Sequence, residues 1–210
     1  MRARRGVASL VLVPLIVVVA MLGIAPTAGA KKASTAAVSL DNVTGGQSAL
    51  FVPLSNVVQF GQDNVFTSPI SPAYLTFTLQ EGPAVRFPIS GGAVESATML
   101  GTVNHAGGLS IQKHHPVGTI VKQLDVTDIK IVNGITLVGN AFGVVPAPTA
   151  DLINSTHSKT PVTGVIHYEA DAQINVATAT VLNTYFDTTV FTPGMILGHL
   201  KSDIQTKPIL

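Results

Sequence analysis

The stretch RFPISGGAVESATMLGTVNHAGGL, residues 86–109, carries the strongest signals for the fold of this chain. It contains two short extended patterns, and a glycine pair follows each of them: Gly91 and Gly92 after the first, Gly107 and Gly108 after the second. Glycine adopts the positive φ angles that tight turns require and that residues with a Cβ atom resist. We therefore expect a strand, a hairpin turn, a second strand and a second turn.

The rest of the chain has a composition typical of β structure. Charged residues make up only 11% of it, whereas strand formers such as Val and Thr and turn formers such as Gly and Pro are abundant. Asn133 and Gly134 separate two alternating runs, and Asn-Gly is typical of a type I′ hairpin turn. The sequence predicts an all-β fold, an antiparallel β-sandwich or a barrel-like domain, over residues 49–210.

Residues 176–186 depart from the β pattern. Apolar side chains recur there at helical spacing, and Asn175 is a suitable N-cap. We therefore expect one short helix near 176–186.

The patterns of hydrophobic and polar residues also predict the structure of five other segments. We expect strands over 50–54 and 57–60, a polar connection over 62–72, an amphipathic strand over 74–80 with one buried face, and a surface loop over 147–161.

Residues 1–30 have the three parts of a secretory signal peptide. A basic head at residues 2–5 precedes an apolar run over 7–24, and the small-residue pattern Ala28-Gly29-Ala30 follows. We expect cleavage after Ala30 and a secreted or cell-surface protein. The alternative is that the apolar run, close to the roughly 18 residues that can cross a bilayer, stays as an anchor. Membrane contact is expected only through this segment.

Removal of the signal peptide changes the charge of the chain. Three of the twelve basic residues lie in it, which leaves nine against eleven acidic residues, a formal charge of −2 instead of +1. Because the mature chain lacks a basic surface, nucleic acid is not expected as a partner. The chain has no cysteine, so packing and strand pairing must supply its stability. We expect a flexible N-terminus over 31–48 before the single β domain.

The six histidines are the first candidates for a metal site: His105, His114, His115, His157, His167 and His199. They belong to separate segments, and the adjacent His114 and His115 would point to opposite faces of a strand. We therefore expect no metal site. The chain also lacks a Gly-x-Ser-x-Gly motif, and its glycine pairs lack the strand-to-helix context of a phosphate loop. We expect that the protein is not an enzyme.

Three segments of the chain resemble exported actinobacterial proteins. Those proteins carry the signature RFPITGG followed by G-x-I-x-HSGGL, which residues 86–92 and 101–109 match here. They tend to end with LN and F-x-x-G-x-x-LG, a pattern that residues 182–198 contain. They are in turn similar to the corynebacterial Hta-type haem-uptake domain, a β-rich surface module.

The resemblance to the Hta type implies that a tyrosine binds the haem iron and that a histidine supports this ligand. It places the histidine at His105 and, by order along the chain, the tyrosine at Tyr74. The residues alone favour simpler roles: His105 as a brace for the turn at Gly107-Gly108, and Tyr74 as a half-buried strand aromatic.

Two functions therefore stay open. The first is an exported, non-enzymatic binding or structural module without a cofactor, whose partners are cell-envelope components or other surface proteins. The alternative is a binder of haem, or of another small apolar ligand, in a pocket bordered by Tyr74 and His105.

Overall fold

The structure, a computed structural model, describes residues 39–141 and 144–207. The expected signal peptide at 1–30 lies outside the described residues. Within them, no helix is long and apolar enough to cross a membrane.

The described residues form strands and two helices, in this chain order: β1 (Asp41–Phe51), α1 (Leu54–Gln62), β2 (Val65–Ile70), β3 (Tyr74–Thr78), β4 (Gly82–Val94), β5 (Gly101–His105), β6 (Gly108–His114), β7 (Ile120–Val132), β8 (Thr136–Ala141), β9 (Val144–Thr160), β10 (Val165–Gln173), α2 (Val176–Phe186) and β11 (Ile196–Thr206).

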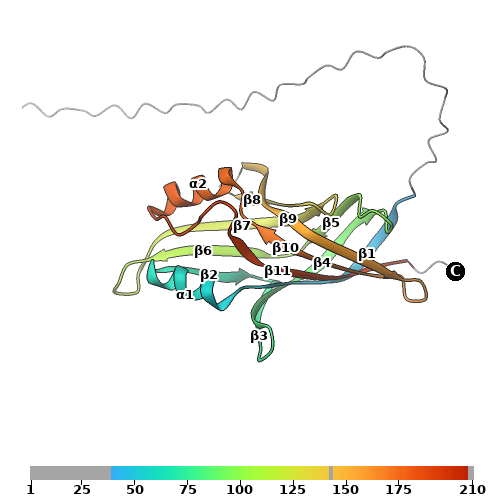
Figure 1. Cartoon of the computed structure of the whole chain (residues 1–210), viewed down its shortest axis with the longest axis horizontal. Coiled ribbons are helices and arrows are strands. Elements are labelled where there is room, and N and C mark those ends of the chain that lie inside the picture. Colours follow the sequence, from blue (N-terminus) through green and yellow to red (C-terminus); the bar gives the residue numbers. More distant parts are fainter. Residues whose placement is uncertain (1–38, 142–143, 208–210) are drawn as a thin grey trace, which may run out of the picture. The chain divides into compact units, whose positions relative to one another are not determined.

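Part of the antiparallel sheet closes on itself (Figure 1). The closed part has the order β7–β5–β4–β1–β11–β10–β9–β8, and β8 pairs back with β7. β6 and β2 extend the sheet beyond β7, and among the described strands β3 pairs only with β4. The all-β prediction is confirmed. Because the sheet closes, it is barrel-like rather than a sandwich of two sheets.

Alternating apolar side chains fill the inside of the sheet. Strand β10 shows the pattern: Ile166, Tyr168, Ala170 and Ala172 are buried, and the residues between them are at least partly exposed. In β1, the interior side chains include Ser48. The interior is therefore apolar with a few buried polar groups, and these need partners.

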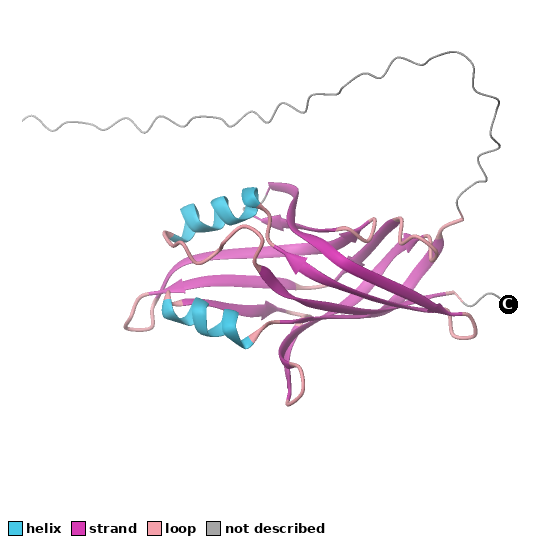
Figure 2. Ribbon diagram, in the orientation of Figure 1, coloured by secondary structure: helices cyan, strands magenta, loops and turns pink. Residues whose placement is uncertain are grey.

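Both helices lie toward the same end of the sheet (Figure 2). They meet the sheet in a second apolar cluster, in which the ring centroid of Phe191 is 5.3 Å from that of Phe60 in α1 and 6.4 Å from that of Phe186 in α2. The buried apolar residues of the protein therefore continue beyond the main core, beneath the two helices.

Strand β4 runs through Gly91 and Gly92, so the hairpin turn expected there is wrong. Both residues pair with β5, next to a shift in register, and have φ values of 147° and 132°. A Cβ atom on Gly92 would lie 2.1 Å from the carbonyl oxygen of Thr102. Glycine is needed here because two backbones approach closely at a β-bulge.

Glycines at positive φ also occupy two loops. Gly107, with φ of 84°, lies between β5 and β6, and Gly108 is the first residue of β6. Asn133 and Gly134 join β7 to β8 with φ values of 52° and 61°, the pair of positive angles that defines a type I′ turn.

Strand β1 begins at Asp41, so residues 41–48 belong to the sheet rather than to the flexible segment expected over 31–48. The pair Gly45-Gly46 has low strand propensity, but it allows contact with β11: a Cβ on Gly46 would lie 2.0 Å from the carbonyl oxygen of Asp203. Residues 31–38 lie outside the described part.

Helix α1 and strand β2 replace the strand expected over 57–60 and the connection expected over 62–72. The β-branched pair Val57-Val58 favours a strand locally, but contacts distant in sequence hold the helix. Asn56 Nδ2 donates a hydrogen bond of 2.6 Å to the carbonyl oxygen of Ile196, and Phe60 is buried.

Strand β9 replaces the loop expected over 147–161. Its sequence is polar because only one face packs inward. Among residues 149–160, whose burial the structure describes, Ala150 and Leu152 are the buried residues.

Strand β3 forms where the alternating pattern predicts it, but the apolar face expected to be buried is open. Leu75 and Phe77 are 62% and 65% exposed, and Leu79 beyond the strand is 97% exposed. The alternation predicts the strand correctly, but it cannot tell whether another element covers it.

Helix α2 confirms the prediction of a helix over 176–186. The side chain of Asn175 accepts a hydrogen bond of 2.9 Å from the backbone N–H of Thr178, and the inward face contains Ala179, Leu182 and Phe186.

The Asn175 cap leads to a stability prediction. Asn175→Ala leaves an N–H of the first turn without its partner and should lower the free energy of unfolding by about 1 kcal/mol, measured by urea unfolding. Thr180→Ala is the control, because that exposed hydroxyl bonds only within the helix, to the carbonyl oxygen of Val176. Equal losses in the two variants would contradict a capping role for Asn175.

Candidate functional site

His105 lies inside the barrel, where both ring nitrogens have partners. Nδ1 is 3.1 Å from the carbonyl oxygen of Ile129, and Nε2 is 2.7 Å from Ser48 Oγ. A carbonyl can only accept, so Nδ1 carries the proton and Nε2 accepts from Ser48. Ser48 Oγ in turn lies 2.7 Å from Ser202 Oγ and accepts from it. These three side chains form a buried polar chain across β5, β1 and β11.

Burial controls the charge of His105. The side chain is 6% exposed, and desolvation lowers the pKa of the imidazole to about 4, although the hydrogen bond to Ile129 acts in the opposite direction. The ring is therefore neutral at physiological pH. The arrangement is that of a structural brace for the interior.

Tyr74 lies on the other face of the sheet. Its hydroxyl is 2.6 Å from Gln47 Nε2, and Gln47 also accepts a bond of 2.9 Å from Arg86 Nη1. Because Gln47 and Ser48 are neighbours on β1, their side chains point to opposite faces. The structure therefore does not bring Tyr74 and His105 together.

The other two tyrosines are also engaged elsewhere. The hydroxyl of Tyr168 donates to the carbonyl oxygen of Gly134 at 2.7 Å, and burial raises its pKa to about 12. The hydroxyl of Tyr185 donates to the carbonyl oxygen of Gln123 at 2.6 Å. A tyrosine that binds iron must lose its proton, which burial opposes at Tyr168.

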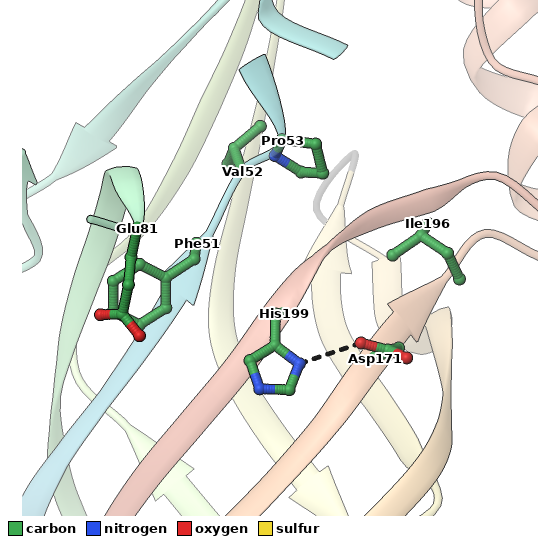
Figure 3. A pocket seen from close by; sticks show the side chains of 7 residues that line it. All are labelled: Phe51, Val52, Pro53, Glu81, Asp171, Ile196 and His199. Atoms are coloured by element: carbon green, nitrogen blue, oxygen red, sulfur yellow. Dashed lines mark hydrogen bonds and ion pairs between the residues drawn. The ribbon is translucent and has the colours of Figure 1, made fainter. Parts of the chain in front are cut away.

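A cavity of about 320 Å³ lies where β1 passes into α1 (Figure 3). Its wall is formed by side chains from β1 and the residues after it, the β3–β4 turn, β10 and β11: Phe51, Val52, Pro53, Glu81, Asp171, Ile196 and His199. Four of the seven are apolar, and the others can be charged. Such a mixture is typical of a small-molecule site.

His199 is held in place by an acidic side chain. Its Nδ1 lies 2.9 Å from Asp171 Oδ1, as the dashed line in Figure 3 shows. The other oxygen of Asp171 accepts a hydrogen bond of 2.9 Å from Asn154 Nδ2. The bonds from Asn154 and His199 lower the pKa of Asp171, so this carboxyl is ionised and accepts from Nδ1–H.

Lys201 neutralises the second acid in the cavity wall. Its ammonium group pairs with Glu81 and lies 5.5 Å from the ring centroid of Phe51. The hydrogen bond to Glu81 raises the pKa of Lys201.

Sequence reasoning missed this cavity. Phe51, Asp171 and His199 are far apart in the chain, and they meet because β1, β11 and β10 are neighbours, with Phe51 opposite His199 and His199 opposite Asp171. No local motif marks such a group. Within the described part of the chain, no cluster of three His, Cys, Asp or Glu side chains could hold a metal ion.

Solved structures with a similar fold come from Corynebacterium glutamicum. The C-terminal domain of HtaA aligns with a TM-score of 0.58 and 17% identity, over 80% of this chain and 100% of that domain. The haem-binding protein HtaB aligns with a TM-score of 0.58 and 12% identity, over 80% and 96%. The N-terminal domain of HtaA aligns with a TM-score of 0.51 and 16% identity, over 79% and 98%.

The comparisons by sequence give no such match: no family model and no curated protein matches the chain. The similarity therefore lies in the arrangement of the strands and helices rather than in sequence identity. The described chain has the fold of the corynebacterial HtaA and HtaB domains.

Proposed function

We propose that this chain is an exported protein that binds haem, or a closely related planar tetrapyrrole. The observation that carries the proposal is the partly apolar cavity beside His199, in a fold shared with a haem-binding protein. Export rests on the signal-peptide pattern of residues 1–30. The interpretation as a module that contacts the cell envelope stays a prediction.

The cavity residues fit the chemistry of a haem. A porphyrin is a flat, mostly apolar ring, and Phe51, Val52 and Ile196 provide apolar contacts for it. The iron needs a protein ligand, and His199 provides an imidazole in the same wall. At about 320 Å³ the cavity is at the lower end of the range for small-molecule sites, so part of the ring would stay outside it.

The two residues of the ligand pair implied by the resemblance lie on opposite faces of the sheet. His105 has both nitrogens bonded inside the barrel, and Tyr74 bonds Gln47 on the opposite face. Neither residue lines the cavity. Bound haem supplies an iron centre and strong light absorption; the side chains of this cavity supply the apolar contacts and the donor atom.

A titration with haemin tests the proposal. We expect a saturable change in the haem absorption band at micromolar protein. Ile196→Glu puts a carboxylate into the cavity wall and should weaken haemin binding at least about tenfold, because an unpaired charge opposes burial of the ring.

Ile135→Glu is the matched control. This residue is 60% exposed and does not line the cavity, so the same change of charge should leave haemin binding unaltered. No saturable change with the wild-type protein would overturn the proposed function. Equal loss in both variants would show that binding does not occur in this cavity.

A further inference from the structure

We propose that His199 binds the haem iron in this protein, in place of the tyrosine that the Hta resemblance implies. The inference rests on the proposed haem function and adds the identity of the ligand. It depends on three features of His199: its place in the cavity wall, the partner of Nδ1 and the surroundings of Nε2.

The partner of Nδ1 fixes the tautomer. Asp171 accepts the Nδ1–H at 2.9 Å, and Asn154 holds the same carboxylate from its other oxygen. When the ring carries only this proton, its lone pair is on Nε2. Histidines that bind metals commonly donate their other N–H to a carboxylate in this way, which orients the ring and makes Nε2 a better donor.

Nε2 has one charged neighbour, Glu169, whose Oε2 lies 3.6 Å away. This distance is longer than a hydrogen bond but short enough for an ion pair when the ring is protonated. Both side chains are partly exposed, at 41% for His199 and 51% for Glu169, so the carboxylate has room to turn away when iron binds Nε2. A porphyrin already supplies four nitrogens to the iron. One imidazole therefore suffices, and a cluster of three protein ligands is not required.

The other histidines lack this combination. His199 is the histidine of the six that lines the cavity. His105 uses both nitrogens in the interior, and Nε2 of His157 bonds the carbonyl oxygen of Ala97 at 2.8 Å. His167 has a similar carboxylate partner, Asp203 at 2.7 Å, but lies outside the cavity wall. His167 is therefore a matched control for His199.

Three carboxylates and one ammonium group lie in or beside the cavity wall: Glu81, Asp171, Glu169 and Lys201. Lys201 pairs with Glu81 and compensates its charge. Asp171 and Glu169 would repel the propionate groups of a haem, which must therefore point away from them. The Lys201 ammonium also lies over the ring of Phe51 in the same wall, where it could approach a propionate.

A comparison of two porphyrins, one with iron and one without, distinguishes binding of the iron by His199 from binding of the ring by the cavity. Wild-type, His199→Ala and His167→Ala proteins are titrated with haemin and with metal-free protoporphyrin, and absorption and electron paramagnetic resonance spectra are recorded for the haemin complexes. His199→Ala should bind haemin at least about tenfold more weakly and change both spectra, because the axial nitrogen is lost. Its affinity for metal-free protoporphyrin should fall clearly less than its affinity for haemin, because only the contact of the ring with the imidazole is lost there.

Added imidazole should restore the wild-type spectrum of the His199→Ala complex, and His167→Ala should behave as wild type. Asp171→Asn, which retains the imidazole but weakens its anchor, is a second variant and should bind haemin roughly 10-fold more weakly. If wild-type protein binds haemin and His199→Ala gives the same spectrum, the ligand assignment is overturned and the proposed function stands. If wild-type protein binds neither porphyrin, both are overturned.

Discussion

Gly92→Ala should unfold the protein or lower its free energy of unfolding by at least about 4 kcal/mol, since single substitutions reach this size only when they disrupt the interior or the backbone. The added Cβ would lie 2.1 Å from the carbonyl oxygen of Thr102 and 3.2 Å from the Cα of Val103. Both neighbours are backbone atoms, so β4 and β5 must separate to relieve the overlap. Thermal and urea unfolding followed by circular dichroism measure the effect.

Gly91→Ala is the matched control. Gly91 also has a positive φ, 147°, but the nearest atom to its added Cβ is the carbonyl oxygen of Val43 at 3.9 Å. Only the backbone strain of an alanine in this conformation should remain, about 2 kcal/mol. If Gly92→Ala were no worse than Gly91→Ala, the close approach of β4 and β5 would be contradicted.

His105→Ala should destabilise the protein in a pH-dependent way. The folded pKa of about 4 is below the ordinary value of 6.5, so the unfolded chain takes up a proton at higher pH than the folded one. The stabilising contribution of neutral His105 is therefore fully present above about pH 6.5 and is lost as the pH falls toward 4. A pKa difference of this size corresponds to about 3 kcal/mol.

Urea unfolding of wild type and His105→Ala between pH 7.5 and pH 4.5 measures this contribution. The difference in free energy of unfolding between the two proteins should be largest at pH 7.5 and should shrink by about 2.5 kcal/mol at pH 4.5. His167→Ala, in which an exposed histidine is removed, is the control. A wild-type-to-His105→Ala difference that does not change with pH would contradict the account of the buried chain formed by Ser48, His105 and Ser202.

The sequence predicts the parts of the fold that local chemistry determines. The all-β class follows from composition, helix α2 from its Asn175 cap and apolar spacing, and the link between β7 and β8 lies at the Asn133-Gly134 pair. Where distant contacts decide, the local pattern is misleading. Helix α1 contains Val57-Val58, which favours a strand, and forms because Asn56 and Phe60 contact residues about 130 or more positions away.

Glycine pairs are a second example of a local pattern that does not determine the structure. Gly91-Gly92 indicates that glycine is needed, but a turn and a bulge require it for different reasons, and only the pairing of β4 with β5 distinguishes them. The exposed apolar face of β3 is a similar case. The alternation of apolar and polar residues predicts a strand with one apolar face, but it does not tell which element, if any, covers that face.

The candidate site is harder to predict than the fold. His105 stands out in sequence because glycines flank it, yet its neighbours Ser48 and Ser202 come from the two ends of the described chain. His199 has no flanking motif, and its place beside Phe51 and Asp171 depends on the strand order β1–β11–β10. A sequence alone gives neither the order nor the register of these strands.

A crystal structure of the protein with haemin tests the central claim most directly. We expect the porphyrin against Phe51, Val52 and Ile196, with the iron bonded to Nε2 of His199 and Asp171 still bonded to Nδ1. Haemin at another place on the molecule, or iron bonded to Tyr74 or His105, would contradict the account.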